Sequence, residues 1–110
     1  MTVKELADRL ELKSLNLAAP DRAVTGGYCG DLLSWVMGHA PADSAWMTIM
    51  SNINVAAVAA LTDVACVILT EDVDPDATLA QRAAQQGINL LGTGLSTYDC
   101  AARLAELLGA

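Results

Sequence analysis

A short run of apolar residues past the middle of the chain sets the strongest limit on the fold. The run is Val64–Leu69, Val-Ala-Cys-Val-Ile-Leu, and polar residues stand on both sides of it. A continuous apolar run of this length is typical of a strand in a parallel sheet that is covered on both faces. Parallel strands need a long crossover between them, which is usually a helix. The run therefore predicts an α/β fold.

The segments around this run alternate between strand and helix patterns from residue 45 onward. The predicted strands are Leu12–Leu17, Val24–Cys29, Ala45–Met50, Val64–Leu69 and Ile88–Leu91. Helices are predicted after an N-cap at Thr2, over Leu32–Met37 with Asp31 as cap and Gly38 as stop, over Ile53–Leu61 after Ser51-Asn52, from Asp74-Pro75 to Gln86 before Gly87, and from Ser96 onward. We expect residues 1–110 to form a single α/β domain: a mostly parallel sheet of about five strands, flanked by helices. The first two strands are short and could join either edge, parallel or antiparallel.

Charge, the length of the apolar runs and cysteine usage limit the partners and the compartment of the chain. The chain has 13 acidic and 6 basic residues, a net charge of −7, so nucleic acid and anionic membranes are poor partners. The longest apolar run, Val55–Leu61, is too short to cross a bilayer, and the N-terminal segment reads as an amphipathic helix rather than a signal peptide. Cys29, Cys66 and Cys100 are far apart in sequence and form no CxxC motif, which favours buried thiols in a reducing compartment. We expect a cytoplasmic protein without a metal site or cofactor.

A group of large apolar residues lies in the middle of the chain. It consists of Trp35, Met37, Trp46, Met47 and Met50. These residues could form the core, or they could form a subunit interface, where Trp and Met are enriched. Apolar residues make up 54% of the chain, more than one thin layered domain easily hides. We therefore expect a homodimer.

Small polar residues follow the predicted strands, where a parallel sheet commonly binds ligands. Asn52 and Asn54 come after one strand, and Thr93 and Gly94 come after another. Such residues, together with free amides at helix N-termini, can hold a phosphate or another anion. They can equally serve as caps and tight turns. Both interpretations stay open at this stage.

Signs of catalysis are weak. His39, the single histidine, follows Gly38 at a predicted helix end and suits a cap or a surface group better than a general base. Asp72, Asp74 and Asp76 suit a solvated capping cluster better than a calcium loop, because the glycine and closing glutamate of such a loop are missing. There is no Walker A sequence. We predict that the chain is not an enzyme.

One segment resembles a known family. Asp21, Arg22, Thr25, Gly26 and Gly27, with Ala23 and Val24 between them, resemble the signature of the DRTGG domain family. Further similar stretches are Cys29–Met37, Asn54–Ala56, Leu61–Ala65 and Gly87–Leu91, so the resemblance covers nearly the whole chain. The chain looks like a small stand-alone member.

The resemblance implies a regulatory or architectural role. Similar domains occur beside CBS domains in nucleotide-regulated pyrophosphatases and at the front of some phosphotransacetylases, and the fold is similar to the N-terminal domain of HPr kinase. In those settings the domain helps form dimers, and catalysis belongs to other domains.

The signature residues also have a direct chemical interpretation. Gly26 and Gly27 lack Cβ atoms, which indicates a bulge or a close backbone approach. Thr25 offers a hydroxyl group. Arg22 could anchor a carboxylate or phosphate, or could simply pair with Asp21 or another acid.

Two hypotheses follow. The first is a non-catalytic homodimeric regulatory module that binds a small anionic ligand, such as an adenine nucleotide, and passes its state to a protein partner. Its candidate ligand-binding residues are Asp21, Arg22, Thr25, Gly26, Gly27, Asn52, Asn54, Thr93 and Gly94. The second is a ligand-free interaction or accessory subunit of a larger enzyme or signalling complex.

Overall fold

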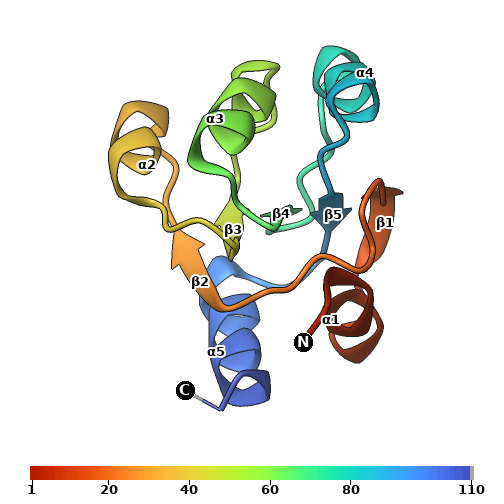
Figure 1. Cartoon of the computed structure of the whole chain (residues 1–110), viewed down its shortest axis with the longest axis vertical. Coiled ribbons are helices and arrows are strands. Elements are labelled where there is room, and N and C mark those ends of the chain that lie inside the picture. The colour runs from red at the N-terminus through yellow and green to blue at the C-terminus, as the bar shows by residue number, and fades with distance from the viewer. Residues whose placement is uncertain (110) are drawn as a thin grey trace.

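Five strands form one sheet in the order β1-β5-β4-β3-β2 in the computed structural model, which describes residues 1–109 (Figure 1). The strands are β1 (Lys13–Asn16), β2 (Gly26–Cys29), β3 (Ser44–Thr48), β4 (Cys66–Leu69) and β5 (Leu90–Gly92). Neighbours from β2 to β5 are parallel, and β1 is antiparallel to β5. The predicted mostly parallel α/β sheet is confirmed, and the first strand takes the antiparallel edge.

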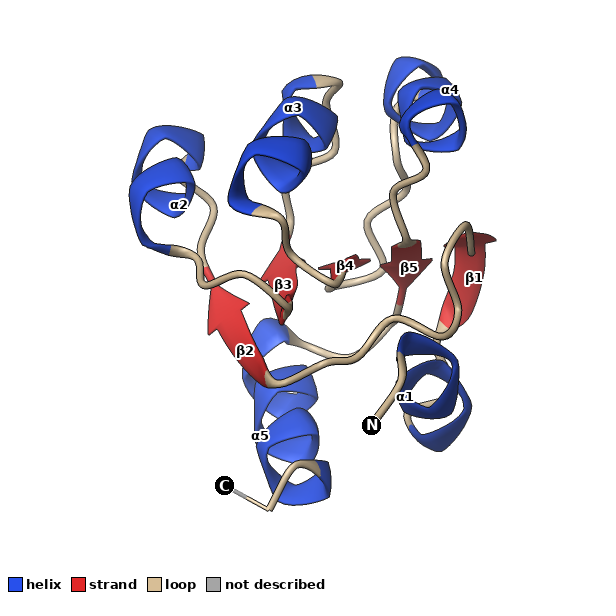
Figure 2. Ribbon diagram, viewed as in Figure 1, coloured by secondary structure: helices blue, strands red, loops and turns tan. Residues whose placement is uncertain are grey.

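Helices cover both faces of this sheet (Figure 2). The crossover helices α2 (Leu33–His39), α3 (Asn54–Thr62) and α4 (Ala77–Gln86) lie on one face, while α1 (Val3–Arg9) and α5 (Thr97–Leu107) lie on the other. Crossovers between parallel strands have one hand, so strands that step across the sheet in one direction place their helices on one side. The chain leaves β5 toward the opposite face to form α5.

The central strand β4 lies within the apolar run Val64–Leu69. All of its residues are buried, and they alternate between the two apolar layers. Cys66 and Ile68 pack on the side of α1 and α5 with Leu6 and Leu104, among others. Val67 and Leu69 pack on the other side, under α2, α3 and α4. This confirms a strand covered on both faces.

Helix ends follow the predictions only where the cap is local. Thr2 and Glu5 form a capping box, and the hydrogen bonds from the Thr2 backbone and hydroxyl lower the pKa of Glu5. Ser96 caps α5 by accepting from the Asp99 amide, and Gly87 ends α4 at a φ of +68°. These three ends agree with the sequence prediction.

The predicted ends of α2 are wrong. Asp31 does not cap this helix, because its Oδ1 accepts from Thr48 Oγ1 at 2.8 Å and from the Ile49 amide at 2.9 Å. Leu32 takes the cap position without a side-chain hydrogen bond. The helix also continues through Gly38, since glycine stops a helix only where the backbone turns left-handed.

The starts of α3 and α4 also differ from the prediction. Asn52 Oδ1 accepts from the Asn54 amide in a tight turn, so the residue at the cap of α3 is Ile53. Helix α4 begins at Ala77 rather than at Asp74-Pro75. The extended backbone of Asp76 donates to the Ser51 carbonyl at 2.9 Å, which holds this segment outside the helix.

The group of large apolar residues divides between core and surface. Trp46 and Met47 are buried, and Trp46 Nε1 donates to the Gly30 carbonyl at 2.9 Å. Trp35 is 57% exposed and Met37 is 47% exposed, both on α2. Part of the group is therefore core, and the α2 part is free for contacts.

Within residues 1–109, no helix has the length and apolarity that a membrane span requires.

Candidate functional site

The candidate residues lie at opposite ends of the parallel strands. Asp21, Arg22, Thr25, Gly26 and Gly27 lie before or at the start of β2, which is the amino edge of the sheet. Asn52, Asn54, Thr93 and Gly94 follow β3 and β5, at the carboxyl edge. Because β2 to β5 run in the same direction, the structure does not bring these two groups together.

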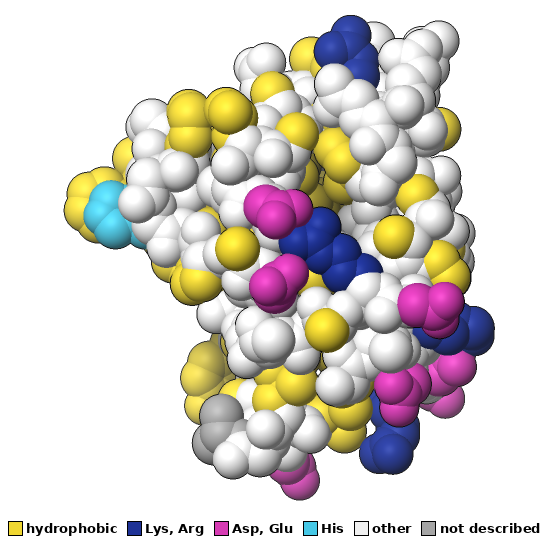
Figure 3. Space-filling view, in the orientation of Figure 1, with side chains coloured by type: hydrophobic (Ala, Val, Ile, Leu, Met, Phe, Trp, Pro, Cys, Tyr) yellow, Lys and Arg dark blue, Asp and Glu magenta, His cyan; other side chains and the backbone are white. Residues whose placement is uncertain are grey.

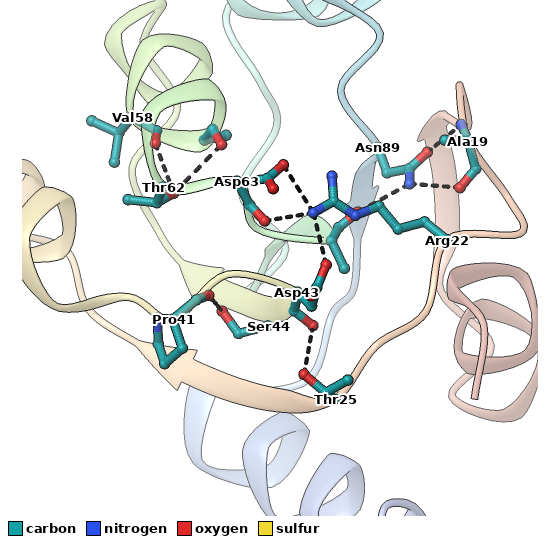
Figure 4. A network of polar contacts seen from close by, with 12 residues as sticks. Ala19, Arg22, Thr25, Pro41, Asp43, Ser44, Val58, Thr62, Asp63 and Asn89 are labelled. Atoms are coloured by element: carbon teal, nitrogen blue, oxygen red, sulfur yellow. Dashed lines mark hydrogen bonds and ion pairs between the residues drawn. The ribbon is translucent and has the colours of Figure 1, made fainter.

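Arg22 is the centre of the polar contacts at the amino edge (Figure 4). Its Nη2 lies 2.9 Å from Asp43 Oδ1 and 2.9 Å from Asp63 Oδ1, and it donates to the Asp63 carbonyl at 2.6 Å. Burial alone would lower the pKa of Arg22, but the hydrogen bonds to Asp43 and Asp63 outweigh it and raise the pKa. Of the interpretations left open, Arg22 pairs with acids distant in sequence rather than with Asp21.

The two aspartates also shape the backbone at this edge. Asp43 stands directly before β3 with a φ of +63°, and Asp63 ends α3 with a φ of +58°. Asp is one of the few residues besides Gly that tolerate this left-handed region. The Asp43 amide donates to the Asp63 carbonyl at 3.0 Å, and the Thr25 amide donates to the Asp43 carbonyl at 3.0 Å. Arg22 therefore fastens the starts of β2, β3 and β4 to one another.

Asn89 holds the segment around Ala19, which leads to this edge of the sheet. The sequence reasoning did not select this residue. Its Nδ2 donates to the carbonyls of Ala19 and Ala65 at 2.9 and 3.0 Å, and its Oδ1 accepts from the Ala19 amide at 2.8 Å. The residue is 3% exposed. A hollow of about 260 Å³ lies beside it, with Arg22 and Asp63 in its lining. The available signal was an Asp or Asn at or just before the start of three predicted strands, at positions 43, 63 and 89.

Arg22→Met is expected to lower the free energy of unfolding by roughly 1–2 kcal/mol. The substitution keeps much of the apolar stem and removes both ion pairs and the bond to the Asp63 carbonyl. Urea denaturation at low and high salt is the measurement. The matched control is Lys4→Met, which removes an exposed pair with Asp8 and should cost less than about 0.5 kcal/mol. Equal losses in the two variants would contradict a fastening role for Arg22.

Side chains at the carboxyl edge mostly hold their own backbone. Glu71 Oε2 accepts from the Thr97 amide at 3.1 Å and so takes up the N-terminus of α5. Thr93 Oγ1 accepts from the Leu95 amide at 3.1 Å, and Asn52 accepts from the Asn54 amide. These contacts match the interpretation as caps and turns. At the N-terminus of α3 the cap residue Ile53 makes no side-chain hydrogen bond, and the amides of Asn54, Val55 and Ala56 bond locally to Asn52 and Ile53.

A largely apolar groove of about 300 Å³ is lined by residues of β2, β3 and α5. It is lined by Thr25, Gly26, Gly27, Cys29, Met47, Ala101, Leu104, Ala105 and Leu108. A Cβ at Gly27 would lie 2.7 Å from Leu104 Cδ2, whereas a Cβ at Gly26 would meet nothing within 4 Å. The predicted close approach is confirmed at Gly27, and the register from β2 to β3 is continuous, without a bulge.

The three thiols and the histidine are further reactive groups of the chain. Cys66 and Cys100 are buried as predicted, and burial raises their pKa to about 12 and about 11. The prediction is wrong for Cys29, which is exposed in the groove because β2 is an edge strand. Burial of its sulfur and then the charge of Asp31 raise its pKa too. His39 Nδ1 lies 2.8 Å from the Trp35 carbonyl, and the rings stack at 3.9 Å, so His39 is a surface cap.

Metal-ligating side chains do not gather in the described chain. Among residues 1–109, no group of three or more His, Cys, Asp or Glu side chains is placed to hold a metal ion.

Comparison with known families now identifies the fold. The family model of the DRTGG domain matches residues 43–107. The chain belongs to the DRTGG domain family. The matched part contains Asp43, Asp63 and Asn89, while the Asp21–Gly27 segment lies ahead of it. No curated protein matches the chain.

A solved structure shows the same DRTGG fold in a larger setting. It is the CBS and DRTGG domains of the regulatory region of Clostridium perfringens pyrophosphatase, complexed with the activator diadenosine tetraphosphate. The TM-score is 0.70 at 14% sequence identity. The match covers 94% of this chain and 45% of the other, so this chain spans less than half of that regulatory region.

Proposed function

We propose that residues 1–110 act as one non-catalytic regulatory domain, that the domain works as a homodimer, and that a small anionic ligand such as an adenine nucleotide sets its state. The observation that carries the regulatory part is that the prominent polar side chains support the backbone. Arg22 bonds Asp43 and Asp63, and Glu71 bonds the start of α5. Side chains that bond the backbone of their own chain stabilise the scaffold. The surface of the domain then remains available to signal to a partner that a ligand is bound.

The choice of ligand rests on a solved structure with a similar fold and on the N-terminus of one helix. The pyrophosphatase region with the same fold was crystallised with an adenine dinucleotide activator. In this chain, Asn52 and Asn54 flank the N-terminus of α3, where the cap residue Ile53 makes no side-chain hydrogen bond and Asn52 Oδ1 accepts from the Asn54 amide. Helix N-termini favour phosphate, because the helix dipole attracts negative charge there. We place the phosphate at this end rather than beside Arg22, whose guanidinium already faces two carboxylates.

A thermal-shift experiment tests the ligand. The purified chain is heated with ATP, AMP, diadenosine tetraphosphate, GTP or inorganic phosphate. Ligand at 100 times its Kd stabilises a fold by about 2.7 kcal/mol, which for a chain of this size raises Tm by more than about 10 °C. We expect a shift with adenine nucleotides that Asn54→Ala removes and Thr25→Val keeps. The reverse pattern would move the ligand to the amino edge, and no shift with any compound would reject the ligand.

A ligand-free interaction subunit is the second candidate. The observation that favours it is the exposed apolar surface at α2, where Leu32 is 67% and Trp35 is 57% exposed. Isolated apolar side chains are ordinary on a protein surface, but neighbouring ones mark contact sites. Affinity capture without added nucleotide should then recover one stoichiometric partner, and Trp35→Ser should reduce its recovery.

A further inference from the structure

The hollow at the amino edge of the sheet combines apolar and charged side chains. Its volume is about 260 Å³, and it lies where α3 and α4 end and the chain enters β4 and β5. Apolar lining comes from Ala59, Val64 and Ile88, among others, and the charged lining residues are Arg22 and Asp63. Figure 3 shows this face, where a basic side chain lies between two acidic ones beside a depression with apolar atoms. A concave surface with a few polar groups suits a small molecule.

The guanidinium group of Arg22 keeps donors that its two aspartates do not use. Its contacts with Asp43 and Asp63 all start from Nη2, as the dashed lines in Figure 4 show. A guanidinium carries five N–H groups, of which two belong to Nη2. The other three, on Nε and Nη1, have no hydrogen-bond partner among residues 1–109. The Arg22 side chain is 29% exposed and lines the hollow, so these donors are accessible to a ligand oxygen.

Negative charge at the hollow comes from two helix ends and one carboxylate. Helices α3 and α4 both end here, at the left-handed residues Asp63 and Gly87. The carbonyls at a helix C-terminus carry partial negative charge, which favours a cation. Neither helix, both within residues 1–109, has a basic residue in its last turn. The Asp63 carboxylate adds a full negative charge, with Oδ1 paired to Arg22. A positively charged ligand group is therefore favoured beside these helix ends.

Charges of both signs in one small hollow select a zwitterion. A plain anion would meet the carboxylate of Asp63 and the helix ends, and a plain cation would meet Arg22. We infer that the hollow binds a free α-amino acid with a short apolar side chain. Its carboxylate accepts from Arg22, its ammonium group faces Asp63 and the helix ends, and its side chain lies against Ala59 and Ile88. This hollow and the N-terminus of α3 lie at opposite edges of the sheet, so the amino acid is a second ligand beside the proposed nucleotide.

An NMR titration of the ¹⁵N-labelled full chain tests the inference. The probes are glycine, L-alanine, L-valine and L-leucine, and we expect saturable shifts of the amide signals of residues 59–65 and 86–89 with valine. Two analogues of valine each lack one charge: 3-methylbutanoate has no ammonium group, and valinamide has no carboxylate. Each analogue should bind about 10-fold more weakly than valine or worse, because it leaves one charge-assisted hydrogen bond unmade.

Two pairs of variants separate the hollow from general effects. Ala60→Leu fills the hollow from α3 and should abolish the valine shifts, whereas Ala57→Leu, at an exposed position of α3 outside the hollow, should keep them. Asp63→Asn should weaken valine binding about 10-fold or more, because it removes the carboxylate that faces the ammonium group. Asp43→Asn also removes an ion pair of Arg22 but does not line the hollow, so binding should stay within about twofold. Asparagine tolerates the left-handed backbone at both positions, and circular dichroism checks that each variant folds.

Three results would overturn the inference. The first is that none of the four amino acids gives saturable shifts at these amides. The second is that 3-methylbutanoate binds as tightly as valine, since Arg22 would then recognise a plain carboxylate. The third is valine binding that Ala60→Leu leaves unchanged. Asn54→Ala, which tests the nucleotide site, should leave valine binding unchanged, so failure of the nucleotide and failure of the amino acid are distinguishable.

Discussion

Asn89→Asp is expected to lower the free energy of unfolding at pH 7 by about 3 kcal/mol. The amide of Asn89 donates to two carbonyls, those of Ala19 and Ala65, and is almost completely buried. An aspartate of the same shape cannot donate to them when ionised. It would also place a charge against two carbonyl oxygens. Urea denaturation of both proteins measures the difference.

The pH dependence of this loss has a definite sign. Burial and the two carbonyls disfavour the charged form, so the new carboxyl group has a higher pKa in the folded state than its unfolded value of about 3.9. A raised folded pKa gives a relative stability that is present below the unfolded pKa and is lost as pH rises through the folded pKa. The deficit of Asn89→Asp should therefore be smallest near pH 4 and largest at neutral pH.

Asn52→Asp is the matched control for this prediction. Asn52 uses its side-chain oxygen to accept from the Asn54 amide, which an aspartate does equally well. Its free energy of unfolding should change by less than about 0.5 kcal/mol at any of these pH values. Similar losses in the two variants would show that the donor role of Asn89 is not what holds residues 19 and 65 to the sheet.

Local patterns explain what the sequence could predict. The covered run at Val64–Leu69 and the N-cap at Thr2 depend on residues within a few positions of one another, and both are confirmed. Asp31 shows the limit of such reasoning. A short acidic residue before a helix is a good cap, yet its carboxylate is taken by Thr48 and Ile49 from the next strand. A distant donor outcompeted the local one.

The same division between local and distant contacts holds for the candidate site. Sequence reasoning selected Arg22 and recognised that an acid could pair with it, but the acids are 21 and 41 positions away. The separation of the candidates into two groups could have been predicted. Residues before and after parallel strands lie at opposite edges, so Arg22 and Thr93 could never share one small ligand once the sheet was taken as parallel.

Gly27→Val is expected to lower the free energy of unfolding by about 2 kcal/mol. Even the Cβ would lie 2.7 Å from Leu104 Cδ2 and 3.2 Å from Met47 Cε, and both of those residues are buried. Both atoms are the ends of flexible side chains that line the groove, so either these side chains take less favourable rotamers or α5 shifts away from the sheet. Gly26→Val is the control. A side chain at Gly26 meets nothing within 4 Å, neither glycine has a positive φ, and valine favours strands, so its stability should stay the same or rise slightly.

A double-mutant cycle shows whether the contact with Leu104 is the cause. Leu104→Ala alone should cost about 2–5 kcal/mol, because it leaves a cavity between α5 and β2. In the double variant the valine methyl groups occupy part of that cavity, so the combined loss should be at least about 1 kcal/mol smaller than the sum of the single losses. All four proteins are measured at the same low concentration, which keeps contacts between copies out of the comparison. Additive losses would mean that the strain at Gly27 lies elsewhere, and the close packing of α5 on β2 would no longer explain why this position is glycine.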